Sequence, residues 1–149
     1  MTHGLDTSFL VAVEVACHAD HAAARLVAGT LRRNGDRFAL APQVLSEFVH
    51  IVGDPRRFTA PLTMGQALER ATVWWEADDV ERVSPSEPSV TWFLSAMKKH
   101  QLGRKRVLDT LLAGTYRSIG VTSLLTLNAA DFAVFGEFSC VPIGVRAGS

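Results

Sequence analysis

Short apolar runs alternate with longer amphipathic segments along this chain. Apolar runs bounded by turn-forming or polar residues predict β-strands. The first is a short run that leads into Asp6, and the others lie at residues 38–41, 80–83, 121–126 and 138–143. Longer segments with apolar residues on one side predict helices, at residues 8–16, 20–33, 42–52, 63–77, 88–101, 107–119 and 128–135. Strands that alternate with helices predict an α/β fold with a parallel sheet covered on both faces.

Composition supports one globular domain over residues 1–149. Hydrophobic residues make up 48% of the chain and charged residues 20%, which is typical of a folded protein. No repeat, low-complexity tract or linker interrupts the pattern. Fifteen basic and fifteen acidic residues give a formal net charge of zero, so a nucleic-acid partner requires a local cluster of positive charge.

The cysteines and the chain ends bear on the cellular compartment. Cys17 and Cys140 are far apart and do not have the spacing of a metal or redox motif. The N-terminus lacks the plan of a secretory signal, and no apolar run approaches the ~18 residues that a membrane span needs. We therefore expect a cytoplasmic protein with reduced cysteines and no membrane partner.

Four carboxylates lie in apolar surroundings. Asp6 follows the first strand, Glu47 lies within an apolar helix, Asp109 begins a helix, and Asp131 follows the strand that ends at Thr126. Three of the four are at strand-to-helix or loop-to-helix junctions, on what should be one end of the sheet, where ligands of open α/β sheets bind. Carboxylates that converge repel one another unless a cation compensates. Mg²⁺ suits such a cluster because it prefers oxygen ligands.

Each carboxylate also has an ordinary interpretation. Asp6 or Thr7 could cap the helix that follows, and Asp109 could be an acidic residue favoured by a helix N-terminus. Glu47 and Asp131 could lie on solvated helix faces. The occurrence of all four at related positions favours a shared site.

A basic segment leads directly into Asp109. Residues 98–106 hold five basic side chains and no acid, namely Lys98, Lys99, Arg104, Lys105 and Arg106. Such side chains contact phosphates without reading sequence, so we predict RNA contacts here. The alternative is a solvated loop. The pairs at residues 32–33 and 56–57 are lesser candidates.

Four segments together resemble the signature of PIN-domain ribonucleases. They lie at residues 5–8, 46–48, 107–115 and 126–132. The chain length and residues 18–25 are most similar to the VapC toxins of bacterial toxin–antitoxin pairs. The resemblance extends over essentially the whole chain, and it rests on the order and spacing of the motifs together.

The resemblance implies a PIN-like three-layer α/β/α sandwich with a central parallel sheet of about five strands. It also implies a Mg²⁺ or Mn²⁺ site, cleavage of RNA, a homodimer and a cognate antitoxin that blocks the site. Apolar positions that look exposed, namely Val11, Phe58 and Trp75, would be available to such a partner.

Phosphodiester hydrolysis explains why carboxylates would gather. A bound metal lowers the pKa of a water and neutralises charge on the phosphate. We predict Asp6 and Asp109 as ligands, and Glu47 as a ligand directly or through water. Thr7 and Thr126 would hold the carboxylates in place.

The fourth position is a departure from the family pattern. The family often has an acid two residues after the strand-ending threonine, and this chain has Asn128 there. Asp131 lies three residues further on, and positions three apart share a helix face. We favour Asp131 as the fourth acid with Asn128 in support, and the reverse assignment stays open.

Other classes fit less well. A phosphatase of the haloacid-dehalogenase type needs a second aspartate two residues after the first, where Ser8 stands. A nucleotide-binding module would need a glycine-rich phosphate loop. No Ser-His-Asp or Cys-His arrangement is recognisable. A catalytically idle PIN-like module that only binds RNA or an antitoxin remains the main alternative.

Overall fold

A five-stranded parallel sheet forms the centre of the molecule. The computed structural model describes residues 1–144 and orders the strands β3-β2-β1-β4-β5. The strands are β1 (Thr2–Leu5), β2 (Arg37–Leu40), β3 (Val80–Arg82), β4 (Ser123–Leu125) and β5 (Ser139–Cys140). The chain moves outward from β1 to one edge and then to the other, so strand order reverses beside β1. This reversal opens a crevice at the carboxyl ends of the strands.

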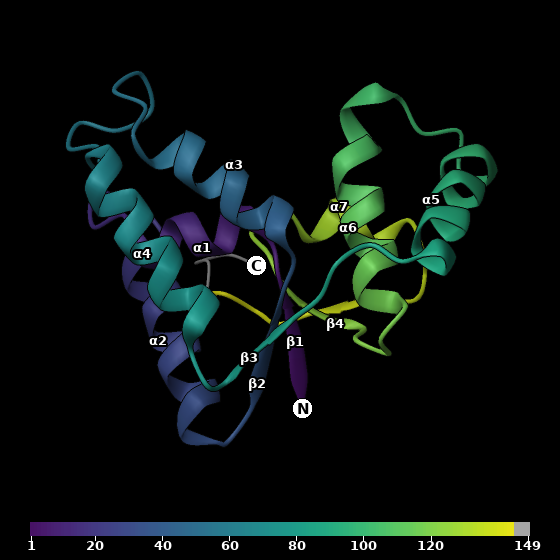
Figure 1. Ribbon diagram of the computed structural model, residues 1–149, viewed down its shortest axis with the longest axis horizontal. Coiled ribbons are helices and arrows are strands. Elements are labelled where there is room, and N and C mark those ends of the chain that lie inside the picture. Colours follow the sequence, from purple (N-terminus) through teal and green to yellow (C-terminus); the bar gives the residue numbers. More distant parts are fainter. Residues whose placement is uncertain (145–149) are drawn as a thin grey trace.

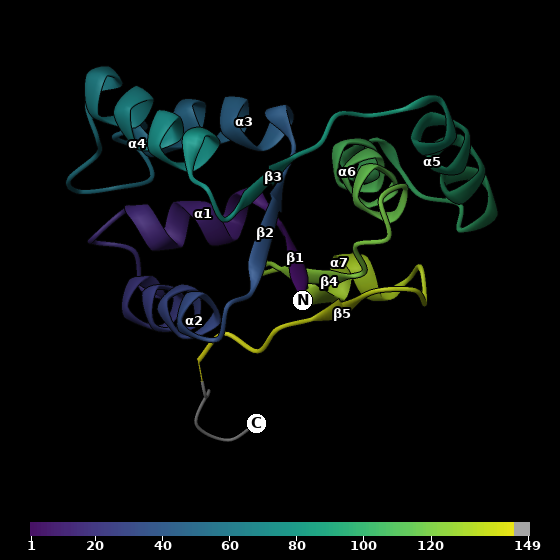
Figure 2. The ribbon, with the colours of Figure 1, turned by 60° about the horizontal axis from the view of Figure 1, so that its bottom comes forward.

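Helices cover the sheet from two sides, as Figures 1 and 2 show. The helices are α1 (Thr7–Glu14), α2 (His21–Arg33), α3 (Pro42–Val52), α4 (Met64–Glu76), α5 (Glu87–Lys99), α6 (Val107–Arg117) and α7 (Ala129–Ala133). Helices α1 to α4 gather on one side and α5 to α7 on the other. The predicted three-layer α/β/α sandwich with a central parallel sheet of five strands is therefore confirmed. Within the described residues, none of the helices combines the length and the apolar character that a membrane span requires.

The predicted elements all form, and most differ from the prediction only at their ends. Thr63 caps α4 with a reciprocal capping box. The last two strands are shorter than predicted, because residues such as Val121 and Ile143 pack against the core without pairing in the sheet. A 3-10 turn at Arg104–Arg106 was not predicted.

Tyr116 on α6 joins the ends of two strands. Its ring is fully buried, and its hydroxyl donates to the Leu5 carbonyl at 2.5 Å and accepts from the Ala41 amide at 3.4 Å. Leu5 ends β1 and Ala41 follows β2, so one side chain fixes the positions at which α1 and α3 begin. Gly4 makes this approach possible, because a Cβ there would lie 2.5 Å from the Tyr116 ring.

A second buried polar group lies toward the amino ends of the strands. His3 Nδ1 lies 2.7 Å from Ser123 Oγ, and His3 Nε2 lies 2.8 Å from Asp36 Oδ2. The hydrogen bond with His3 lowers the pKa of Asp36. Sequence reasoning recognised no Ser-His-Asp arrangement, since these residues are distant in the chain. They tie β1, β4 and the start of β2 together, at the opposite end of the sheet from Asp6.

Replacing Gly4 with alanine should destabilise the protein. The added methyl would overlap a fully buried ring, and overpacking of this kind costs about 1–3 kcal/mol. The urea midpoint of unfolding, followed by circular dichroism, measures the effect. Gly103→Ala is the matched control, because a Cβ there meets nothing within 4 Å. Equal midpoints for the two variants would contradict the close contact between Gly4 and Tyr116.

Candidate active site

Asp6 lies at the junction between β1 and α1, where its carboxylate is held by two hydroxyls. Thr126 Oγ1 donates to it at 2.6 Å and Ser8 Oγ at 2.9 Å. The parallel pairing of β1 with β4 places Thr126 beside Asp6. Asp6 occupies the N-cap position of α1 but makes no side-chain cap bond. The capping interpretation of Asp6 is therefore wrong.

Glu47 reaches the same region from α3. Helix α3 begins with Pro42 directly after β2 and packs on α1. Thr7 Oγ1 donates to Glu47 Oε2 at 3.1 Å, and Glu47 is partly buried. It does not lie on a fully solvated helix face. Thr7 and Thr126 thus each hold one carboxylate.

Asp109 lies in the first turn of α6, seven residues before Tyr116. Burial, together with the negative charges of Asp6, Asp131 and Glu47, raises its pKa to about 6, and the charge of Arg106 opposes that rise. The structure therefore brings the four predicted carboxylates into one electrostatic neighbourhood.

Asp6 and Glu47, like Asp109, have a raised pKa. Burial raises the pKa of Asp6, and the hydrogen bonds from Thr126 and Ser8 offset part of that rise. Burial also raises the pKa of Glu47, and the charge of Asp6 adds to it. Burial and mutual repulsion of this kind are typical of functional sites.

Arg106 differs from the rest of the basic segment. Its guanidinium donates to the backbone carbonyl of Asp131 and lies 3.9 Å from the Asp131 carboxylate. Its Nε is buried and has no hydrogen-bond partner within residues 1–144. Lys98, Lys99, Arg104 and Lys105 are exposed. Asp131 therefore already has a cationic neighbour at the edge of the site, which sequence reasoning did not anticipate.

A cavity of about 270 Å³ contains three of the four carboxylates. Asp6, Glu47 and Asp109 line it together with Asn128, which is exposed. Asp131 is not among the lining residues. His18, Arg57 and Phe58 also line the cavity. The sequence predicts Arg57 as a lesser candidate for RNA contacts and Phe58 as available to a partner, but it places neither beside the carboxylates. The position of Arg57 shortly after the helix that carries Glu47 is the feature of the sequence that could have placed it near the carboxylates.

The donors in this cavity suit a hard divalent cation by type, because they are carboxylate, hydroxyl and amide oxygens. Across the described part of the chain, no three His, Cys, Asp or Glu side chains are placed to hold one ion. Mg²⁺ is usually held by one or two carboxylates and keeps several waters. The burial and mutual repulsion of Asp6, Glu47 and Asp109 are also what a cation would relieve. The residues present therefore fit Mg²⁺ or Mn²⁺.

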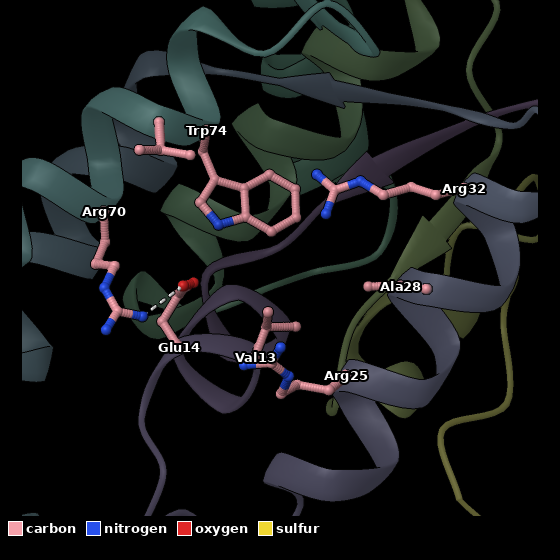
Figure 3. A pocket seen from close by; sticks show the side chains of 9 residues that line it. Val13, Glu14, Arg25, Ala28, Arg32, Arg70 and Trp74 are labelled. Carbon is pink, nitrogen blue, oxygen red and sulfur yellow. Dashed lines mark hydrogen bonds and ion pairs between the residues drawn. The ribbon is translucent and has the colours of Figure 1, made fainter.

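A second cavity, of about 400 Å³, lies between α1, α2 and α4, and Figure 3 shows its lining side chains. Arg70 pairs with Glu14 at 3.1 Å. Arg32 pairs with Asp79 at 2.8 Å and lies 4.8 Å from the Trp74 ring. Glu14 is the only acidic residue in the lining and is already paired. This cavity is larger, but it does not offer the oxygen donors of a metal site.

No family model and no curated protein matches the sequence. The chain nevertheless shares its fold with solved structures of VapC and VapBC proteins. VapC20 of Mycobacterium tuberculosis, described as a sarcin-ricin loop cleaving toxin, matches with a TM-score of 0.64 and 17% identity over 93% of this chain and 97% of the other.

Two VapBC structures match equally well. VapBC2 of Rickettsia felis, bound to a DNA fragment from its promoter, gives a TM-score of 0.68 and 15% identity over 95% of this chain and 98% of the other. VapBC-1 of nontypeable Haemophilus influenzae gives a TM-score of 0.62 and 18% identity over 95% of this chain and 97% of the other. Likeness at this level of identity establishes the shared fold.

Replacing Asp109 with asparagine should stabilise the metal-free protein at high pH only. The folded-state pKa of Asp109, about 6, lies above the ordinary aspartate value. Ionisation of Asp109 therefore lowers the free energy of unfolding as the pH rises from about 4 to above about 6. In a chelator, the melting temperature of Asp109→Asn should exceed that of the wild type at about pH 7.5 and match it at about pH 4.

The exposed Glu69 on α4 provides the control for this comparison. Glu69→Gln should show no such pH-dependent gain. A gain for Asp109→Asn that is the same at both pH values would contradict the electrostatic origin.

Proposed function

We propose that this protein is a metal-dependent endoribonuclease and the toxin of a toxin–antitoxin pair. The observation that carries the proposal is the cavity at the carboxyl edge of the sheet, which Asp6, Glu47 and Asp109 line together. The fold shared with VapC toxins supports it, as does the description of VapC20 as a sarcin-ricin loop cleaving toxin.

The metal, Mg²⁺ or Mn²⁺, would be held directly by Asp6 and Asp109, and Glu47 would reach it through a water. When bound, it would supply an activated water and neutralise charge on the scissile phosphate. The hydrogen bonds from Thr126 and Thr7 hold two of these carboxylates in fixed positions, and partners of this kind support metal affinity and activity. Glu47, whose pKa is raised by burial, is suited to orient the attacking water and accept its proton.

Positive charge near the acidic cavity would position the RNA. The exposed side chains of Lys98, Lys99, Arg104 and Lys105 lie at the end of α5 and in the 3-10 turn that precedes α6. Arg106 lies further in and would remain close to the phosphate backbone. Contacts of this type raise affinity for any RNA sequence, so RNA selection must come from elsewhere.

The assembly is also a proposal. We expect a cytoplasmic homodimer, silenced by an antitoxin that covers the acidic cavity. The two similar structures are named VapBC, for a toxin together with its partner, and they support the antitoxin part of this proposal. The predicted exposure of Val11 is wrong, because its side chain is 5% exposed. Phe58 and Trp75 are half-buried. Exposed apolar side chains lie instead on α4 and α5, such as Leu68, Val73 and Leu94.

Purified protein should cleave RNA in the presence of Mg²⁺ or Mn²⁺ and stop when a chelator is added. Asp6→Asn should abolish cleavage. Thr126→Val, which loses the 2.6 Å hydrogen bond to Asp6, should lower the rate about 10–100-fold. Thr122→Val is the control, because Thr122 is exposed and lies just before the same strand. Cleavage that continues in chelator would contradict the metal role, and RNA binding without cleavage would favour the idle module.

Asp131 and Asn128 can be separated by metal dependence. Asp131→Asn should raise the metal concentration needed for half-maximal cleavage, because it removes a negative charge near Asp6 and Asp109. Asn128→Ala should have a smaller effect, since it removes only a neutral oxygen. The measurement is the cleavage rate across a metal titration. A silent Asp131→Asn with an inactive Asn128→Ala would reverse the assignment.

A further inference from the structure

Two chemically different sets of residues line the cavity with the carboxylates. The first set is acidic and consists of Asp6, Glu47 and Asp109. The second set holds no acid and is apolar, aromatic and basic, with Val11, His18, Ile51, Arg57, Phe58 and Leu127. A metal and its waters account for the first set only, so the second set needs a separate explanation.

Two residues of the second set, His18 and Phe58, place their rings close to each other. The ring centroids of His18 and Phe58 are 6.3 Å apart, with an angle of 41° between their planes. His18 Nδ1 accepts from the Asp20 amide at 3.0 Å, which fixes the imidazole. Phe58 packs against the core and remains partly exposed. Because the two rings are tilted, a flat ligand that stacks on Phe58 would meet the edge of His18.

Arg57 adds a positive charge that is only loosely paired. Asp54 accepts from the Arg56 amide at 2.9 Å and from Arg56 Nε at 3.4 Å, whereas Arg57 Nε lies 3.8 Å from Asp54. The Arg57 side chain is 60% exposed and lines the cavity, and Arg56 does not line it. Two adjacent arginines therefore share one acid, and only one of them faces the site.

We propose that His18, Phe58 and Arg57 form a nucleotide subsite for the RNA substrate, in which a base stacks on Phe58 beside His18 and its phosphate contacts Arg57. This inference rests on the proposed ribonuclease function and names how the same cavity selects its substrate. A nucleotide combines a flat ring with an anionic phosphate, and the second set of residues combines aromatic rings with a guanidinium. The occupant would be single-stranded RNA, because bases must be unstacked to reach aromatic side chains.

The subsite makes a specific demand on substrate shape. The base next to the cleaved bond must be displaced from any helix, so loops and unpaired segments should be cut and duplexes should not. Aromatic stacking tolerates any base, so Phe58 should give shape selection with modest base preference.

Binding of a short single-stranded RNA tests the subsite. The experiment uses full-length protein with Asp6→Asn, so that the RNA is not cut, and fluorescence anisotropy in Mg²⁺. Phe58→Ala should weaken binding about tenfold, which lies within the range for loss of one stacked base. Phe58→Leu keeps the apolar packing, and should lose most of the same affinity. Melting temperatures of both variants confirm that they are folded.

A set of RNAs that each lack one base locates the contact. In the background with Phe58 intact, one abasic position should weaken binding about tenfold, and with Phe58→Ala that same position should make no difference. Arg57→Gln should weaken binding and lower its salt dependence, and the matched Arg56→Gln should change neither. Equal penalties for every abasic RNA with or without Phe58, or equal effects of the two arginine variants, would overturn the subsite.

The outcomes for the subsite and for the ribonuclease differ. RNA cleavage by the wild type without coupling between Phe58 and an abasic position would leave the ribonuclease intact and refute the subsite. Coupled binding without wild-type cleavage would keep the subsite and refute the ribonuclease. No binding to any RNA would refute both, and point to a protein partner for the aromatic surface.

Discussion

The 2.6 Å hydrogen bond from Thr126 to Asp6 is the interaction on which the proposed site depends. It joins the end of β4 to the end of β1, where strand order reverses and the crevice opens. Asp6 is 7% exposed, and a buried carboxylate is costly unless it is paired or hydrogen-bonded. The hydroxyls of Thr126 and Ser8 supply that compensation and so keep the carboxylate at the crevice.

Tyr116 stabilises the same end of the sheet through two hydrogen bonds of its hydroxyl. Its hydroxyl contacts the last residue of β1 and the residue before α3, and its helix carries Asp109. One rigid side chain therefore relates the three elements that supply Asp6, Glu47 and Asp109. Sites built on such elements hold their geometry better than sites on loops. The remaining repulsion among the carboxylates is left for a cation to relieve.

The fold could be predicted from the sequence because strand and helix patterns alternate clearly. Asp6 could be placed at the crevice because it follows a strand, whereas Glu47 and Asp109 were grouped with it by their apolar surroundings and by the family resemblance. Thr7 is next to Asp6 and Thr126 ends a strand, so both could be predicted as supporting residues. The contact between Arg106 and Asp131 could not be predicted, because it depends on the direction of one long side chain. The pairing of His18 with Phe58 joins two loops that are 40 residues apart, and no local pattern encodes such a contact.

The position of a bound ion tests the account most directly. Mn²⁺ broadens the NMR signals of nearby amides, so a titration of the full-length protein would locate it. We predict that the amides of Thr7, Glu47 and Asp109 broaden first, and that those of Arg25 and Trp74 around the second cavity stay sharp. Broadening centred on the second cavity, or spread evenly over acidic surface residues, would contradict a metal site at the carboxyl edge of the sheet.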